Sequence, residues 1–423
     1  MFKNINGFLL PSFKSVLHNS ISIFLSKSIL PLSFFLLATL IVRKLGLAEF
    51  GKYSISISLY SIFELISLLG LDNFILREVS KDNSLAPKFL VNGLVLGLFS
   101  TAFFYLIVSF VSNLLFYPPE IKLIIYILSI ALFPAFINTL CETLLISLQK
   151  AKYILYTSLL REAFMLLLSF VFLSVFPSLY LVMLAIIISR LIGGLVYIYF
   201  LAKNGIKIYT KIDPIFFKNI FKVVTAFALI SILSNIFLEA DILILSKTVA
   251  VAEVGIYSIA KKIMRLMFIF VYSIITALFP IISHKYYVSK EKFLSLYRVS
   301  FKVILLLSSF LVFITFLSVV WLIKIFFGKA FIDSVIVTKI LIFSILPLSL
   351  SFLFSRFLIV SNRQNKDLLA LCIGLLLFII AGILSALKWS YTGMAFASVI
   401  SITILFGIHY LFVKKYVISL LKA

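Results

Sequence analysis

Long apolar stretches separated by short polar breaks run along the whole chain. Each stretch is about 20 residues long, which lets a helix cross a hydrocarbon core of about 30 Å. The stretches are apolar on every face instead of alternating, so they predict helices and not the strands of a barrel. The pattern predicts an all-α polytopic membrane protein with about twelve transmembrane helices. We expect them at residues 21–42, 53–76, 89–112, 121–146, 153–176, 179–201, 223–246, 256–283, 300–323, 334–360, 368–387 and 391–413.

An eight-residue motif occurs twice and divides the chain into related halves. Ala48–Ile55 reads AEFGKYSI and Ala252–Ile259 reads AEVGIYSI, so six of the eight positions are identical. Six predicted helices precede the basic segment 202–221 and six follow it. Because the number per half is even, both halves insert in the same direction. We expect two parallel six-helix lobes, 1–201 and 222–423, joined by a cytoplasmic connector at 202–221 and enclosing a central cavity.

Composition and charge fit this topology. Hydrophobic residues make up 63% of the chain and charged residues 13%, against about 45–50% and about 25% in soluble domains. The net charge of +23 comes from basic residues scattered over membrane-flanking loops, whereas a nucleic-acid site needs one basic patch. If the N-terminus is cytoplasmic, the cytoplasmic segments hold most of the Lys and Arg. We therefore expect both termini in the cytoplasm of a bacterium, with the chain in its inner membrane and no cleaved signal peptide.

Several kinds of chemistry have no motif in this sequence. The two cysteines, Cys141 and Cys372, lie in different halves and indicate neither a disulfide framework nor a thiolate metal site. We expect both to be packing residues. A Gly-rich nucleotide loop, a zinc-ligand spacing and a nucleophile elbow are also missing. The sequence therefore predicts no cofactor, no resident metal, no ATP-driven pump and no enzyme, and short external loops argue against a glycan polymerase.

Ionisable residues inside predicted helices are the sharpest functional signal, because a charge in lipid is costly and usually faces a cavity or a partner. We interpret four of them, Arg161, Glu162, Arg190 and Arg356, as mainly members of structural pairs. The full set is Lys27, Glu64, Asp72, Glu142, Arg161, Glu162, Arg190, Glu239, Asp241, Lys261, Lys262, Arg265, Lys339 and Arg356.

Four cations are candidate substrate-binding residues: Lys27, Lys261, Lys262 and Arg265. Lys27 precedes Pro31, which bends or loosens a helix, so it either lines an adjustable cavity or snorkels to the cytoplasmic interface. The other three crowd one broad face of the helix at 256–283. They repel one another unless an anion lies among them, and that anion is either an internal acid or a bound phosphate.

Three acids are candidates for proton coupling or for ion pairs: Glu64, Glu239 and Asp241. Glu239 and Asp241 are two residues apart, so we expect them to point to different sides of their helix, with one of them facing solvent or headgroups. Glu64 either carries a coupling proton or pairs with Lys27 or with a cation of the helix at 256–283.

The residues around the first motif resemble a known family. Leu40–Ser54, together with Gly70–Asn73 and Arg77–Glu78, resembles the opening of Wzx-type polysaccharide flippases of the multidrug, oligosaccharidyl-lipid and polysaccharide exporter superfamily. The second motif, after Asp241–Leu245, resembles the opening of that family's second lobe, and the Leu148–Lys150 turn is also similar. The resemblance implies two lobes around a V-shaped cavity lined chiefly by helices 1, 2, 7 and 8, which are the helices that carry the candidate site residues.

The resemblance also implies a function. Such flippases move undecaprenyl-pyrophosphate-linked oligosaccharide repeat units from the inner to the outer leaflet, for O-antigen, capsule or exopolysaccharide synthesis. On this interpretation Lys27 and Arg265 bind the pyrophosphate. We expect a monomer that works beside a polysaccharide polymerase and a chain-length regulator, with no nucleic acid. The alternatives are a cation-coupled drug exporter of the same superfamily, which needs an acid-dominated cavity, and an integral glycosyltransferase or polymerase.

Overall fold

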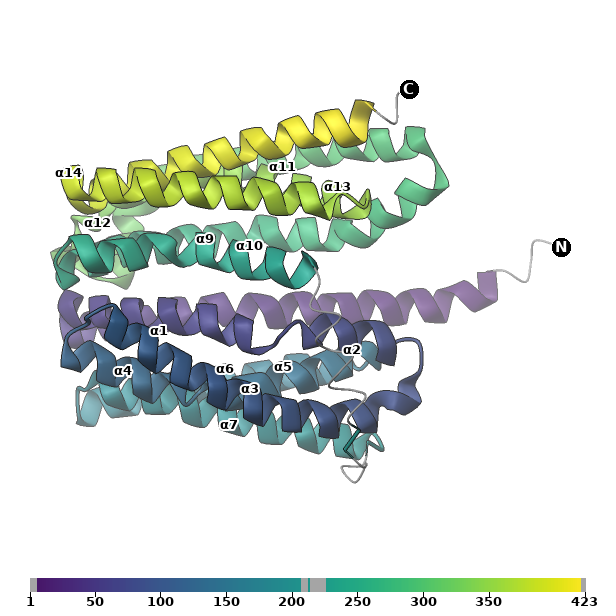
Figure 1. Cartoon of the computed structure of the whole chain (residues 1–423), viewed down its shortest axis with the longest axis horizontal. Coiled ribbons are helices and arrows are strands. Elements are labelled where there is room, and N and C mark those ends of the chain that lie inside the picture. The colour runs from purple at the N-terminus through teal and green to yellow at the C-terminus, as the bar shows by residue number, and fades with distance from the viewer. Residues whose placement is uncertain (1–5, 207–211, 214–225, 420–423) are drawn as a thin grey trace. The chain divides into compact units, whose positions relative to one another are not determined.

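The computed structural model describes residues 6–206, 212–213 and 226–419, and the regular structure of these residues is helical. The predicted all-α fold is confirmed. Most of the predicted connector at 202–221 lies outside the described residues. Figure 1 labels the helices along the chain. They are α1 (Asn6–Ser67), α2 (Leu71–Val79), α3 (Ala86–Leu114), α4 (Pro119–Ser129), α5 (Leu132–Ser147), α6 (Ala151–Val175), α7 (Leu179–Lys203), α9 (Ala226–Thr248), α10 (Val251–Val288), α11 (Lys290–Phe326), α12 (Ser334–Leu341), α13 (Ile345–Val360) and α14 (Gln364–Val413), with short turns η1 (Asn83–Leu85), η2 (Lys329–Phe331), η3 (Ile342–Ser344) and η4 (Lys414–Ile418).

Ten helical segments of the described chain are long and apolar enough to cross a membrane. Two of these segments each contain two helices joined at an interruption. The first, Ser22–Ser67, is interrupted at Gly46, whose φ of 86° is a left-handed conformation that glycine adopts without strain. The last, Gln364–Ile418, is interrupted at Trp389 and Ser390. Both interruptions fall where the sequence predicts a loop between two helices. The ten segments cover most of the twelve predicted helices. The predicted helix at 53–76 is broken after Ser67, with α2 as a separate helix, and the one at 121–146 is divided into α4 and α5.

The contacts between residues divide the chain into two compact units. Unit 1 comprises Met1–Phe34 and Phe63–Val224, and unit 2 comprises Phe35–Ile62 and Thr225–Ala423. Residues 35–62 thus pack with the second half of the chain, although they precede the predicted boundary between the lobes. The lobe boundaries themselves stay a prediction.

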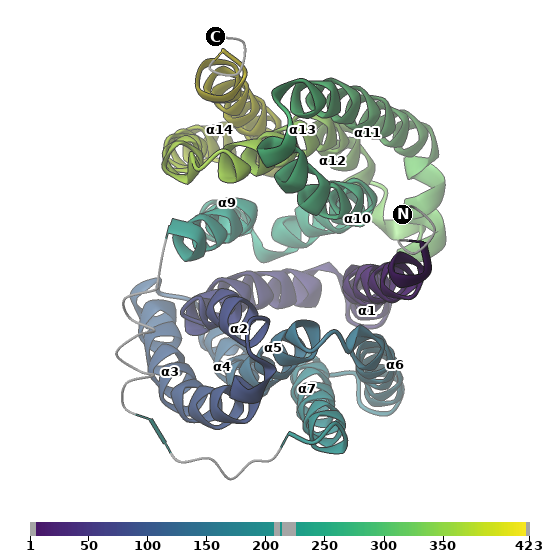
Figure 2. The ribbon, with the colours of Figure 1, turned by 90° about the vertical axis from the view of Figure 1, so that its right-hand side faces the viewer.

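In unit 1, α5 is central and contacts α2, α3, α6 and α7 (Figure 2). Small residues allow α3 to approach it closely. A Cβ added at Gly93 would lie 2.7 Å from Leu140 Cδ1, and one added at Gly97 would collide with the ring of Phe136. Both α5 side chains belong to the buried core of this unit. The two glycines therefore leave room for these side chains between α3 and α5.

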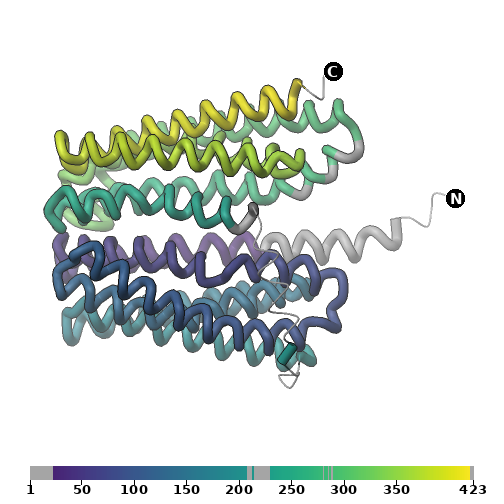
Figure 3. The backbone as a smooth tube through the Cα atoms, viewed as in Figure 1, coloured from purple at the N-terminus to yellow at the C-terminus, as the bar shows by residue number. Residues whose placement is uncertain are grey.

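In unit 2, α14 packs along α9 and α13, and α10 contacts α11, α12 and α13 (Figure 3). An aromatic core joins α11 to α13. The rings of Phe301 and Phe354 stack with centroids 6.0 Å apart, and Tyr297 stacks on Phe354 at 5.9 Å. These contacts join α11 to α13, and α10 adds Val271, Ile275 and Ile282 to the same buried core.

The two copies of the repeated motif contact each other inside unit 2. A Cβ added at Gly51 would collide with the backbone carbonyl oxygen of Val251, and one added at Gly255 would collide with the carbonyl oxygen of Leu47. The contact is reciprocal, because each copy places its glycine against the backbone just before the other copy's glycine. Only a residue without a Cβ permits this approach, which explains why both copies have glycine at this position.

Candidate functional site in the buried charge clusters

A buried charge cluster lies between α9 and α10 of unit 2. The Nζ atom of Lys261 lies 2.5 Å from Asp241 Oδ1 and 3.2 Å from Glu239 Oε2. Arg265 Nη2 lies 2.7 Å from Glu239 Oε1 and donates a second hydrogen bond to the Leu238 carbonyl oxygen at 2.9 Å. Lys261, Glu239 and Asp241 are each at least nine-tenths buried. The anions that the clustered cations require are thus, in this structure, the two acids of α9.

The prediction that Glu239 and Asp241 point to different surroundings is wrong. Both carboxylates are buried, and both reach the same ammonium group. Cβ directions on a helix wheel do not decide such a pairing, because Lys261 has a long flexible side chain and its ammonium group has three donors. The cluster therefore behaves as one network.

Two hydroxyl groups complete the network. The Tyr257 hydroxyl donates to Asp241 Oδ2 at 2.8 Å and lies 3.0 Å from Ser398 Oγ of α14, and Ser58 donates to Glu239 Oε2 at 2.9 Å. Sequence reasoning missed these partners. For Tyr257 a signal was present, since this motif residue stands four positions before Lys261 on the same helix face.

Lys262 is separate from the pairs made by Lys261. Its Nζ lies 5.7 Å from the centre of the Tyr53 ring, a cation–π arrangement with a residue of the first motif. The cluster and Lys262 together hold three cations and two carboxylates, a formal charge of +1 from their types. The side chain of Arg265 is 33% exposed and that of Lys261 4% exposed. An anion arriving from solvent therefore reaches Arg265 and not Lys261.

Unit 1 contains several charge pairs. Lys27 Nζ lies 2.5 Å from Glu142 Oε1, with the lysine side chain 55% exposed. Arg190 Nη1 lies 2.5 Å from Glu64 Oε1, so the predicted partners of Glu64, Lys27 or a cation of α10, are wrong. The sequence cannot show which helices cross at the depth of Glu64. In the structure the partner of Glu64 comes from α7.

Arg161 of unit 1 and Arg356 of unit 2 are two further cations that the sequence predicts in structural ion pairs. Arg161 Nε donates to Glu162 Oε1 at 2.8 Å, and Ser33 donates to Glu162 Oε2 at 2.6 Å, so the prediction of a structural pair is confirmed there. Arg356 instead lies over two rings, 4.4 Å from the centre of Phe352 and 5.4 Å from that of Phe279. Its expected ion pair is replaced by cation–π contacts.

A second polar group in unit 2 joins α13 to α14. His409 Nε2 lies 2.9 Å from Asp367 Oδ1, Ser351 Oγ lies 2.7 Å from His409 Nδ1, and Ser355 donates to Asp367 Oδ2 at 2.9 Å. These residue types also occur in hydrolytic triads. Here Ser351, Asp367 and His409 are each at most 3% exposed, so a substrate has no access and the group is a structural tie between two helices.

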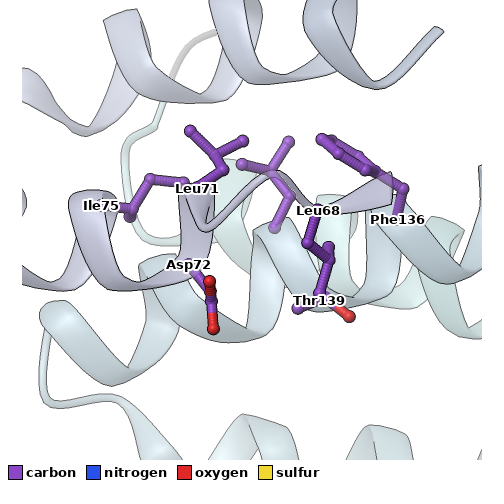
Figure 4. A pocket seen from close by; sticks show the side chains of 7 residues that line it. Leu68, Leu71, Asp72, Ile75, Phe136 and Thr139 are labelled. Atoms are coloured by element: carbon purple, nitrogen blue, oxygen red, sulfur yellow. The ribbon is translucent and has the colours of Figure 1, made fainter. Parts of the chain in front are cut away.

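A small cavity in unit 1 lies beside the break between α1 and α2. Figure 4 shows its lining side chains, which include Asp72 and Leu71 of α2 and Phe136 and Thr139 of α5. The cavity has no room for a water molecule. It therefore cannot hold a sugar or a phosphate, and the clusters of charged residues remain the candidate site.

The cysteines behave differently from each other. Cys141 is buried in the core of unit 1, as expected for a packing residue, whereas Cys372 is exposed on α14. The expectation of packing is therefore wrong for Cys372, because α14 turns that position away from the helices it contacts. Among the described residues no group of three or more His, Cys, Asp or Glu side chains is placed to hold a metal ion.

Comparisons with known proteins bear on both the family and the fold. The sequence model of the family described as "polysaccharide biosynthesis protein" matches residues 16–285. No curated protein matches the chain. An inward-facing multidrug resistance transporter of the MATE family, in the MOP superfamily, has a TM-score of 0.78 at 16% identity, covering 95% of this chain and 99% of that chain.

Two other solved structures are similar over nearly the whole chain. The lipid II flippase MurJ, in an inward closed conformation, has a TM-score of 0.77 at 16% identity, covering 96% of this chain and 89% of that chain. A MOP-superfamily transporter from Pyrococcus furiosus, whose binding pocket is described as having reverse polarity, has a TM-score of 0.70 at 16% identity, covering 97% and 96%. At such identities the likeness shows the fold that these transporters share.

Proposed function

This chain belongs to the polysaccharide biosynthesis protein family, and we propose that it is a flippase for undecaprenyl-pyrophosphate-linked oligosaccharide repeat units. It would carry these units from the cytoplasmic to the outer leaflet of a bacterial inner membrane, by alternating access, for O-antigen, capsule or exopolysaccharide synthesis. It works as a multi-pass monomer with cytoplasmic termini, beside a polymerase and a chain-length regulator. Its fold is that of membrane transporters, including a lipid II flippase.

The observation that carries the proposal is the excess of one cation over the acids when the unit 2 cluster is counted together with Lys262. Arg265 is the most exposed of the residues that pair there, and its partner Glu239 is shared with Lys261. A pyrophosphate can therefore take over Arg265 while Lys261 continues to compensate Glu239, so binding does not leave a buried carboxylate alone. Lys262 adds positive charge in the same unit, and Lys27 stays a proposed substrate-binding residue.

The polarity of the charges argues against the alternative of a cation-coupled drug exporter. An organic cation needs an acid that is available to it. Here Glu64, Glu142, Glu162, Glu239 and Asp241 each lie within 4 Å of a Lys or Arg nitrogen. The similarity to a MATE-family transporter concerns the fold, and the charge pattern favours an anionic substrate.

The experiment that tests this function is complementation of a deletion strain that lacks a redundant flippase. We expect wild type to restore surface polymer, and Arg265→Ala to abolish it and to trap lipid-linked repeat units on the inner leaflet. Arg77→Ala is the matched control, because that arginine pairs with Glu78 in α2 and is 54% exposed. Protein amount in the membrane is measured for each variant. Wild-type polymer with Arg265→Ala, or normal polymer in the deletion strain, would contradict the proposal.

A further inference from the structure

Residues 35–62 belong to the first half of the sequence but are held in unit 2 by contacts at several depths. Nearest the break in α1, Arg43 Nε donates to the Phe326 carbonyl oxygen at 2.6 Å, and its Nη2 donates to that of Ile325. Farther along α1, Ser58 donates to Glu239, and Asn235 donates to the Ser61 carbonyl oxygen at 3.2 Å. Between these two levels lies the reciprocal contact of Gly51 and Gly255.

The glycine contact is made by backbone and not by side chains. At both glycines the atom in closest reach is a carbonyl oxygen of the opposite copy, which cannot rotate away as a side chain would. The two helices therefore close on each other without interlocking side chains at this point. Such a contact is close when formed, and no side chains have to move past one another when the helices separate.

Two hydroxyl groups beside the contact indicate that it is not permanent. Ser54 and Ser258 stand three residues after the two glycines, on the same helix faces. Each is 1% exposed, and the hydroxyl of each has no hydrogen-bond partner. A buried hydroxyl without a partner opposes the packed arrangement, and water would satisfy both groups once the helices separate. Both copies of the motif retain a residue that favours the separated state.

The polar contact at the outer level is also of a kind that can release. Arg43 is exposed, and it donates to carbonyl groups at the C-terminal end of α11, where the helix dipole attracts a cation. Water can replace the carbonyl groups as its partner. No buried charge is left alone when this contact breaks.

We infer that the two motif copies form a gate on the predicted external side, which closes when Gly51 and Gly255 meet and opens when residues 35–62 leave the rest of unit 2. Arg43 latches the closed state, and Ser54 and Ser258 favour the open one. The inference rests on the proposed function, since a flippase must expose its substrate to the outer leaflet in one part of its cycle. Gly51 and Gly255 are the residues that must separate in that part of the cycle.

The test measures access to the contact with an impermeant maleimide added to intact cells. The parent is the full chain with Cys141→Ala and Cys372→Ser, and the reporters are Ser54→Cys and Ser258→Cys, introduced singly. Adding Gly51→Ala places a methyl group against the Val251 carbonyl oxygen, so the closed state is disfavoured. We expect both reporters to react about tenfold faster or more with this substitution, as a shift in a two-state population requires.

Gly407→Ala is the matched control, because a Cβ at that helical glycine meets nothing within 4 Å, and it should change the labelling rate less than about twofold. If folded Gly51→Ala labels no faster than the parent at either reporter, the gate is excluded. If Gly51→Ala does not accumulate in the membrane, Arg43→Gln is measured in its place. This substitution removes the contact of Arg43 with the end of α11 without adding bulk. A rise of about threefold supports the gate, and an unchanged rate excludes it. Labelling needs no glycan, so this result and the complementation result are separable.

Discussion

Charges inside the membrane are arranged differently in the two units. In unit 1 each of these ion pairs joins one cation to one carboxylate: Lys27 with Glu142, Arg190 with Glu64, and Arg161 with Glu162. In unit 2 two carboxylates serve Lys261 and Arg265 jointly, with Tyr257 and Ser58 as further donors. In a pair of one cation and one carboxylate, loss of the cation leaves the carboxylate without compensation. In the shared network, Glu239 keeps Lys261 as a partner when another anion takes over Arg265. We therefore assign the charges of unit 1 to structure, apart from the proposed ligand Lys27, and those of unit 2 to structure and binding together.

The shared network of unit 2 is disrupted most severely by a substitution of Lys261. Lys261→Ala leaves Glu239 and Asp241 buried without the ammonium group that lies between them. We expect a loss of about 3–5 kcal/mol in the free energy of unfolding, which is the usual effect of removing one partner of a buried pair. The measurement is the unfolding midpoint of the purified protein in detergent, with Lys262→Ala as the neighbouring control. A loss no larger than that of Lys262→Ala would show that the two acids do not depend on Lys261.

A separate pair should respond more weakly and should be repaired by removing both partners. Arg190→Ala leaves Glu64 partly buried and alone, and we expect a loss of about 1–3 kcal/mol. Adding Glu64→Ala should restore part of that loss, because the unpaired carboxylate is gone. A complete double-mutant cycle at the same detergent concentration measures the coupling. Strictly additive losses would mean that the pair contributes no interaction energy.

The smallest effect on stability is expected at Lys27. Its side chain is 55% exposed, so Lys27→Ala should change the free energy of unfolding by less than about 1 kcal/mol. Because Lys27 is also a proposed pyrophosphate ligand, surface polymer should fall although the protein remains folded. Lys27→Arg should retain polymer. Normal polymer with Lys27→Ala would remove this residue from the binding site and leave it as a member of an exposed ion pair.

The sequence predicted the helices well and their contacts poorly, for a physical reason. Hydropathy is a property of each segment, so it located the apolar spans and the breaks now seen at Gly46 and at Trp389, but it missed the breaks between α1 and α2 and between α4 and α5. Which charges meet depends on where helices cross, and no periodicity reports that. Glu64 was therefore assigned the wrong partners, and Glu239 and Asp241 were separated although one lysine reaches both.

Residues of mixed character were hardest to interpret from sequence. Tyr257 has an apolar ring and one hydroxyl, so hydropathy treats it as part of the span. Its hydroxyl nevertheless donates a hydrogen bond to Asp241. Arg356 was expected to find an acid and lies instead against two phenylalanine rings. Phe352 lies four residues before Arg356 on α13, and Tyr257 and Asp241 lie on consecutive helices, so only Phe279 of α10 is distant in the chain from its partner.

The backbone contact between the two motif copies has a consequence for genetics. A Gly51→Ala allele places its methyl group against an oxygen that belongs to the main chain at Val251. Every amino acid carries that oxygen, so no codon change at position 251 can remove the obstacle. Selection for restored function from such an allele should return true revertants at codon 51, and an intragenic suppressor would have to act by shifting a whole helix.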